Sequence, residues 1–408
     1  MKIPLSKPSI GESEIAYVTK VLRTGQLCFG SMLEEFESRF ANYAGARYAV
    51  ATNSGTSALH LGVKALGIGP GDEVLTTSFS FAASTNCLLY ERALPVFVDI
   101  DPDTLNIDPF EVRRILKRDY LRDARRKCTV NRRSGRILKA ILPVHVFGLP
   151  CAMDALLEIT RDYNLRVLED ACEALGAESG GRRVGTFGDV AVFAFYPNKQ
   201  ITTAEGGMLV TNDRSIAVLC RSLRNQGRDE NSRWLHHARL GYNYRLSDLH
   251  CALGVAQMER VDDLLAARKY VAAMYSLALG GVSELLPMCD PVDARRSWFV
   301  YVVRLRDSHA RVRDEVISKL RDRGIECQAY FSAIHEQPYL RELCGATVRD
   351  LPHTETASRQ CIALPFFPDM TSRQVQEVSF ALREILAECE TAPHSAAVRQ
   401  RGRVSAIA

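Results

Sequence analysis

Short apolar runs alternate with helix-like segments through the first two thirds of the chain, and this alternation restricts the fold more than any other feature. The runs include Tyr48–Thr52, Glu73–Thr77 and Pro95–Asp99. Segments with helical periodicity, such as Ala82–Tyr90 and Met153–Tyr163, separate them. Strands that alternate with helices predict βαβ units. Because the strands are almost continuously apolar, we predict a mainly parallel central sheet with helices on both faces.

The pattern changes near Val261, where long helical stretches begin to surround isolated strands such as Trp298–Arg304. A chain of 408 residues is also long for a single core. We therefore predict a large α/β domain over residues 1–260 and a smaller C-terminal α+β domain over residues 261–390. The tail, residues 391–408, is polar and basic without apolar periodicity, which predicts disorder.

The bulk composition excludes several classes of protein. A net charge of +4 gives no reason to expect nucleic-acid binding. The basic run Lys117–Arg136 is the local exception, and we interpret it as a solvated loop or helix face. The 12 cysteines include no C-x-x-C pair, and the nine histidines show no metal-ligand spacing. The sequence contains no long apolar run and no apolar segment near Met1. We expect a cytoplasmic protein with reduced thiols, no metal and no membrane segment.

Lys199 follows the strand-like run that begins at Asp189, and a polar turn with Gly206 and Gly207 leads into a second apolar strand. Another predicted strand, Leu165–Asp170, ends in a carboxylate. Pyridoxal phosphate requires a lysine for its Schiff base and a carboxylate that keeps the pyridine nitrogen protonated. The alternative interpretation is a surface lysine beside a hairpin. The combination of the two strand ends favours a cofactor site.

Two further segments suit such a site. In the turn Asn53–Ala58, Gly55 allows close backbone approach and Thr56 opens a helix, which together indicate an anion site for a phosphate. The alternative is an ordinary helix cap. Phe79 and Phe81 follow a predicted strand, and one of them could stack on a planar ring. The alternative is that both are core residues.

The chain resembles the DegT/DnrJ/StrS family of sugar aminotransferases, within fold type I of the pyridoxal phosphate enzymes, the aspartate aminotransferase-like fold. The resemblance covers residues 3 to about 390. The matching stretches occur in family order and are together highly specific: Asn53–His60, Gly67–Val74, Pro95–Asp101, Pro143–Gly148, Glu169–Ala177, Phe195–Lys199, Glu205–Asp213 and Gly241–Asp248.

The resemblance implies a role for several residues. Lys199 matches the Schiff-base lysine that also moves the proton, and Asp170 matches the partner of the pyridine nitrogen. Phe81 matches the aromatic residue that stacks on the cofactor ring. Asn243 matches an asparagine that reaches the phosphate of the neighbouring subunit, which implies a homodimer with shared active sites. The remaining cofactor-binding candidates are Gly55, Thr56, Glu173 and Asn198.

Two positions depart from the family pattern. Many members have a phosphate-binding serine five residues before the lysine, where this chain has Ala194. Phosphate binding must then depend on Thr56, backbone amides, Asn243 and Asn198. Position 173, near the phenolic oxygen of the cofactor, is commonly glutamine or histidine, and here it is Glu173. A carboxylate beside a phenolate is unfavourable unless one of them is protonated.

The resemblance also implies glutamate as the amino donor and a nucleotide-linked 4-keto-6-deoxyhexose as the acceptor. Tyr330 and His335 lie in a segment that matches a family loop near the substrate. An aminotransferase for a keto-cyclitol is the nearest alternative. A pyridoxal phosphate lyase or dehydratase is less consistent with Lys199, because some dehydratase relatives have histidine there. A regulator without catalysis is the remaining alternative.

Overall fold

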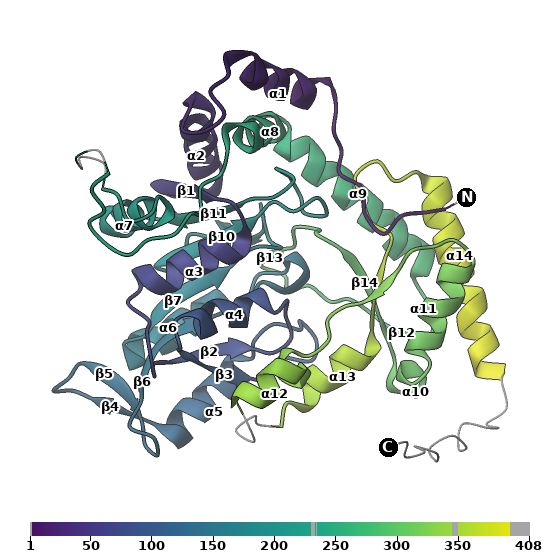
Figure 1. Ribbon diagram of the computed structural model, residues 1–408. Helices are drawn as coiled ribbons and strands as arrows, with labels where there is room; N and C mark the ends of the chain where they lie inside the picture. Colours follow the sequence, from purple (N-terminus) through teal and green to yellow (C-terminus); the bar gives the residue numbers. More distant parts are fainter. Residues whose placement is uncertain (1, 230–232, 234, 345–349, 392–408) are drawn as a thin grey trace, which may run out of the picture.

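A nine-stranded mixed sheet forms the centre of the chain in a computed structural model, which describes residues 2–229, 233, 235–344 and 350–391 (Figure 1). Seven strands run in the order β1-β11-β10-β7-β6-β2-β3, and β11 lies antiparallel to both of its neighbours. The other neighbouring pairs are parallel, so the predicted sheet is confirmed. These strands are β1 Tyr48–Thr52, β2 Glu73–Thr77, β3 Leu94–Val98, β6 Ile137–Leu142, β7 Arg166–Asp170, β10 Val190–Ala194 and β11 Gly207–Thr211.

Helices cover both faces of this sheet because alternate strand residues point to opposite sides. One face, with Val50 and Leu168, packs against α3, α4 and α7. The other face, with Ala51 and Val167, packs against α2, α5, α6 and α8. The bounds of these helices are α2 Ser31–Ala44, α3 Gly55–Ala65, α4 Ala83–Tyr90, α5 Pro109–Asp119, α6 Met153–Tyr163, α7 Arg214–Arg224 and α8 Asp248–Glu259. A further helix, α1 Glu12–Thr24, packs against α8.

A second, four-stranded sheet lies beside the first, in the order β12-β14-β16-β15. Its strands pack with α9, α11 and α14 around a separate apolar cluster that includes Tyr275, Leu320 and Leu382. Ile3 belongs to the same cluster and pairs with Ile325. We propose the domain division near residue 260 on this basis, with the first residues of the chain packed on the smaller unit. The elements are α9 Val261–Leu279, β12 Leu285–Leu286, β14 Tyr301–Leu305, α11 Arg313–Asp322, β15 Gln328–Ala329, β16 Cys361–Leu364 and α14 Ser372–Thr391.

The remaining elements are short. A three-stranded sheet runs in the order β13-β8-β9. The short elements are η1 Val146–Gly148, β8 Glu178–Ser179, β9 Arg182–Arg183, β13 Ala294–Arg295, α10 Asp307–Ala310, η2 Ile334–Glu336, α12 Pro338–Cys344 and α13 Pro352–Gln360. The tail that we predict to be disordered lies, from residue 392, outside the described residues. Among the helices that are described, none is long and apolar enough to cross a membrane.

The basic segment Lys117–Arg136 agrees in part with its interpretation as a solvated loop or helix face. Its basic residues are exposed, and most of them lie at the end of α5 or in turns, but the chain between them forms an antiparallel hairpin of β4 Tyr120–Asp123 and β5 Cys128–Asn131 that was not predicted. The hairpin joins the central sheet where β5 pairs with β6. Tyr120 is buried and donates to Glu73 at 2.6 Å. The hairpin of β4 and β5 extends away from the start of β6 (Figure 1), and the basic residues of its turns are exposed.

Candidate active site

A cavity of about 440 Å³ lies beyond the carboxyl ends of β7 and β10, where open α/β sheets bind their ligands. Both units contribute to its wall, since Tyr330 and Phe331 follow β15 of the smaller unit. Most of the residues that we predict for a cofactor site line this one cavity: Gly55, Thr56, Phe81, Asp170, Glu173, Asn198 and Lys199.

Asp170 ends β7, and its carboxylate is fixed by two donors. The Oγ of Ser84 in α4 donates to Oδ2 at 2.7 Å, and the backbone N–H of Cys172 donates to Oδ1 at 3.1 Å. The residue is 5% exposed. Because each oxygen accepts a hydrogen bond in a buried setting, the carboxylate has a fixed orientation at the cavity wall.

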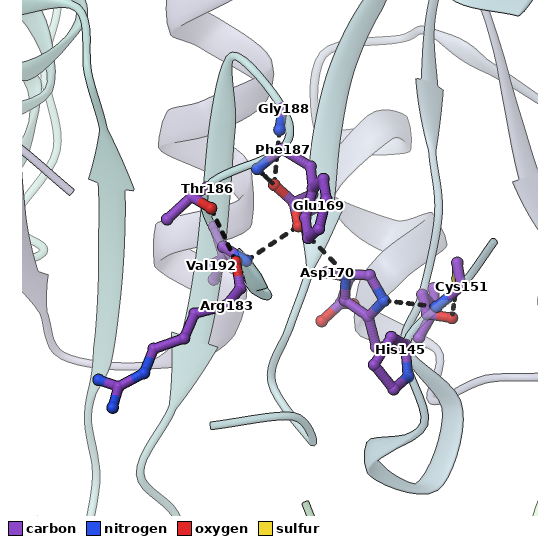
Figure 2. A network of polar contacts seen from close by, with 12 residues as sticks. His145, Cys151, Glu169, Asp170, Arg183, Thr186, Phe187, Gly188 and Val192 are labelled. Atoms are coloured by element: carbon purple, nitrogen blue, oxygen red, sulfur yellow. Dashed lines mark hydrogen bonds and ion pairs between the residues drawn. The ribbon is translucent and has the colours of Figure 1, made fainter. Parts of the chain in front are cut away.

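A buried network lies behind Asp170 on the same strand (Figure 2). The Glu169 carboxylate accepts the backbone N–H groups of Gly185, Phe187 and Gly188, at 2.6–2.9 Å. The Nε2 of His145 lies 3.3 Å from the same carboxylate, and its Nδ1 accepts the N–H of Cys151. An Nδ1 that accepts has no proton, so the ring donates from Nε2 to Glu169. This network fixes the end of β7 from the side away from the cavity.

Lys199 lies in the loop between β10 and β11, as the strand pattern predicts. Its side chain is 14% exposed, and Nζ lies 4.0 Å from the centre of the Phe299 ring. Arg268 in α9 fixes the backbone of Lys199, since its Nη2 donates to the carbonyl of Lys199 at 2.7 Å. Burial lowers the pKa of Arg268 to about 10. The lysine therefore projects into the cavity from a backbone that a buried guanidinium anchors.

The phosphate end that we predict is the N-terminus of α3. Ser54 caps this helix by accepting the N–H of Ser57, which leaves the first amides of the helix facing the cavity. A Cβ on Gly55 would lie 2.6 Å from the Cβ of Ala194, so only glycine fits there without a shift. Ala194 therefore packs against the first residue of α3. A serine at position 194 would add a hydroxyl group to this part of the cavity wall.

The side walls are aromatic. Phe81 is 67% exposed although it lies in the wall of a cavity, and it presents a free apolar face. Phe79, the other candidate for stacking, is fully buried and packs edge-on against Phe147 and Phe331. The structure thus separates the two phenylalanines into one cavity residue and one core residue. Burial raises the pKa of Tyr330, the candidate substrate residue, which lines the same cavity.

Glu173 and Asn198 complete the cofactor-binding candidates in the cavity. Burial, opposed by nearby Lys199 and by a hydrogen bond from Phe147, raises the pKa of Glu173 to about 7. The Oδ1 of Asn198 is buried and has no hydrogen-bond partner within the described part of the chain. A buried acceptor without a partner carries a desolvation cost.

Two predicted site residues do not line the cavity. Asn243 is exposed, and its backbone pairs with Asn225, which follows α7. His335, the other substrate candidate, also lies outside the lining of this cavity: its Nδ1 lies 2.7 Å from the Oγ of Ser78, and its backbone N–H donates to the same oxygen. His335 therefore joins η2 to the end of β2.

Sequence reasoning missed Ser84, Arg268 and Phe299, although each contacts Asp170 or Lys199. The signal for Ser84 was weak, because a serine in the first turn of a helix is common. Arg268 could have been noticed from its position in α9, because it lies at helical spacing from buried apolar residues. An arginine on the buried face of a helix is unusual and indicates a specific partner. The described residues contain no group of histidine, cysteine, aspartate and glutamate side chains that could hold a metal ion.

The cavity fits pyridoxal phosphate. Asp170 suits a protonated pyridine nitrogen, Lys199 suits a carbonyl carbon, Phe81 suits the ring face, and the start of α3 suits the phosphate. A mainly parallel sheet with a carboxylate at one strand end and a lysine facing the same cavity places the chain in the class of fold type I pyridoxal phosphate enzymes.

Comparison with known proteins identifies the family of this chain within that class. The chain belongs to the DegT/DnrJ/EryC1/StrS aminotransferase family, whose model matches residues 8–383. This family depends on pyridoxal phosphate. The chain is 38% identical to the GDP-perosamine synthase of Caulobacter vibrioides, over 94% of this chain and 98% of that protein. It is 36% identical to the spore coat polysaccharide biosynthesis protein SpsC of Bacillus subtilis, over 94% and 97% of the two chains.

The structural comparison agrees. The crystal structure of DesV from S. venezuelae in complex with a ketimine intermediate has a TM-score of 0.82 to this chain, at 31% identity. That match covers 94% of this chain and 98% of DesV. The chain is therefore an aminotransferase in both sequence and fold.

Proposed function

We propose that this aminotransferase moves an amino group from glutamate to the keto group of a nucleotide-linked 4-keto-6-deoxyhexose, using pyridoxal phosphate bound covalently to Lys199. The observation that carries the proposal is the shared cavity of Lys199 and Asp170. The resemblance to a GDP-perosamine synthase supports the sugar class of the acceptor.

The roles of the residues follow from their positions. When bound, pyridoxal phosphate supplies an aldehyde that accepts amino groups and a ring that accepts electrons. Asp170, fixed by Ser84 and Cys172, keeps the ring nitrogen protonated. Lys199 gives and takes the proton at the reacting carbon, through Nζ. Phe81 covers one face of the ring.

The phosphate end requires a second copy of the chain in this proposal. Gly55 and Thr56 supply the amides of the helix start, and Asn198, which lines the same cavity, is the further candidate. Asn243 is exposed and lies outside the cavity of its own chain. We infer that it completes the phosphate site of the partner in a homodimer.

A transfer assay with defined acceptors tests the proposal. The protein with pyridoxal phosphate is given glutamate and then a panel of GDP-linked and dTDP-linked 4-keto-6-deoxyhexoses, with a keto-inositol as the competing acceptor. Mass spectrometry should detect an amino sugar nucleotide and 2-oxoglutarate. Conversion of the keto-inositol alone would favour the cyclitol alternative, and no transfer to any keto sugar would contradict the proposal.

The matched control is Lys199→Ala, with Lys269→Ala on the exposed side of α9 as a surface lysine change. Loss of the proton-transferring group should lower the rate of transfer at least about 100-fold. The Lys269 variant should retain the rate of the unchanged protein.

A further inference from the structure

Glu173 presents one of its two carboxyl oxygens to Lys199. Its side chain is 7% exposed and lies in the loop after β7. The backbone N–H of Phe147, in η1, donates to Oε2 at 2.9 Å. The other oxygen, Oε1, lies 3.8 Å from Nζ of Lys199. This distance is too long for a hydrogen bond, so the pair is close but not locked together.

Four ionisable groups face this carboxyl group. Lys199 comes from the loop after β10, Asp170 and Cys172 come from β7 and its following loop, and Tyr330 comes from the smaller unit. Lys199 favours the carboxylate, while Asp170 opposes it. Burial exceeds both effects, and the pKa of about 7 means that both protonation states occur near neutral pH.

The hydrogen bond from Phe147 decides where the proton of the neutral form resides. Because Oε2 already accepts an N–H, the acid proton belongs on Oε1. Oε1 is the oxygen that faces Nζ. The neutral acid therefore places its O–H next to the amine, and the carboxylate places a negative charge there.

We propose that Glu173 sets the fraction of Lys199 that is a free amine through the charge on Oε1. This proposal rests on the proposed function and deepens it. The carboxylate stabilises the ammonium form of Lys199 across the 3.8 Å between Oε1 and Nζ, whereas the neutral acid does not. Only the free amine attacks a carbonyl carbon, so the ionisation of Glu173 controls how readily Lys199 reacts.

The test uses the cofactor-free protein, so that it does not depend on catalysis. Lys199 is labelled with acetic anhydride between about pH 5 and 9, and its rate of labelling is measured by peptide mass spectrometry. Glu173→Gln removes the charge and keeps an acceptor for Phe147. Glu158→Gln, which removes an exposed carboxylate on α6, is the matched control.

The expected result is a change in the ratio of the two labelling rates. Below about pH 6 Glu173 is neutral, so Glu173→Gln and the unchanged protein should label alike. Above about pH 8 the carboxylate retains the proton on Nζ, and Glu173→Gln should label about tenfold faster, the ratio that an attraction of about 1.4 kcal/mol between the two charges gives. The Glu158 variant should match the unchanged protein throughout. A ratio that stays constant with pH would overturn the proposal.

Two measurements keep the test decisive if Glu173→Gln folds poorly. The labelling rate in the unchanged protein should show an inflection near pH 7, and infrared spectroscopy should show a buried carboxylic acid band that disappears over the same range. An inflection and a band that are both missing would overturn the proposal. If Lys199→Ala abolishes transfer while the labelling ratio is flat, the proposed function stands and this inference fails. If transfer survives Lys199→Ala, the proposed function fails whatever the labelling shows.

Discussion

Lys199 is constrained at its backbone and at the tip of its side chain. Its carbonyl accepts a hydrogen bond from the buried Arg268, and its Nζ lies over Phe299 and near Glu173. An unconstrained lysine would lose about 2 kcal/mol of side-chain entropy when it is ordered for reaction. Part of that loss is already taken in the folded chain, because packing restricts Nζ to the cavity.

Glu173→Gln should change how the stability of the cofactor-free protein depends on pH. Burial raises the pKa of Glu173 to about 7, against an ordinary value of 4.5. The folded chain therefore binds a proton that the unfolded chain has released, and stability falls as the pH rises from 4.5 to about 7. Glutamine does not ionise, so the variant should gain on the order of 3 kcal/mol relative to the unchanged protein across that range.

Urea unfolding at about pH 5 and pH 8 measures this difference. Glu158→Gln should show the pH dependence of the unchanged protein, since that carboxylate is exposed. A Glu173→Gln variant whose stability follows the unchanged protein at both values would mean that the carboxyl group ionises normally.

Ala194→Ser should tighten cofactor binding. Ala194 lines the cavity against Gly55, at the helix start that we propose for the phosphate. A hydroxyl there adds a donor to a charged group, worth about 1.5 kcal/mol or about tenfold in the dissociation constant. Equilibrium dialysis of pyridoxal phosphate measures the constant. Thr56→Val removes a hydroxyl from the same wall and should weaken binding, and an unchanged constant in both variants would place the phosphate elsewhere.

Most of the central sheet could be predicted because its elements carry strong local patterns. The strand Glu73–Thr77 and the helix Met153–Tyr163 have the predicted bounds. Asp170 at a strand end and Lys199 after the next strand could be placed near each other, because parallel strands end at the same edge of a sheet. Local sequence was sufficient to predict an element wherever its hydrophobic periodicity and the residues of the flanking turns indicated the same structure.

The rest depended on contacts between distant segments. The basic hairpin forms because Tyr120 is buried against Glu73, which is 47 positions away in sequence. His335 matches a family loop near the substrate, yet it contacts Ser78 at the end of β2 and is not among the residues that line the cavity. The helices α1 and α2 were not predicted, although Leu33, Phe36 and Phe40 have helical spacing and are buried.

Gly207→Ala should destabilise the protein by disturbing the contact between β11 and the start of α3. A Cβ at Gly207, the first residue of β11, would lie 2.4 Å from the carbonyl oxygen of Ser54 and 2.7 Å from the backbone nitrogen of Gly55. Backbone atoms cannot move as side chains do, so β11 or the start of α3 must shift. The expected cost is about 1–3 kcal/mol in the free energy of unfolding.

The same shift should weaken pyridoxal phosphate binding, because the start of α3 lines the cavity. Gly69→Ala is the control, since a Cβ there meets no atom within 4 Å. Urea unfolding and equilibrium dialysis check both effects. A Gly207→Ala protein as stable as the Gly69 variant would contradict the close approach of β11 to α3.

At the scale of the whole molecule, the cavity depends on two apolar cores. The large sheet supplies Asp170 and the loop of Lys199, while the smaller unit supplies Tyr330. Arg268 and Phe299 connect the two, because both contact Lys199 from outside the large sheet. A change in how the units pack would therefore alter the site without any substitution in it.

Mixing two inactive variants should restore part of the activity if the sites are shared between subunits. Lys199→Ala lacks the lysine, and Asn243→Ala lacks the residue that we propose for the partner's phosphate site. After unfolding and refolding together, half of the dimers are mixed, and one of the two sites in each is intact. Transfer should return to about a quarter of the unchanged rate. No recovery, with mixed dimers confirmed by native mass spectrometry, would mean that Asn243 serves the site of its own chain.

Reduction with borohydride tests the central claim most directly. Treatment of the protein with pyridoxal phosphate and then borohydride converts a lysine–aldehyde link into a stable bond, which peptide mass spectrometry locates. We predict that the cofactor mass is found on the peptide that contains Lys199, and that Asp170→Asn lowers transfer without moving the label. A label on any other lysine, or none at all, would contradict the account.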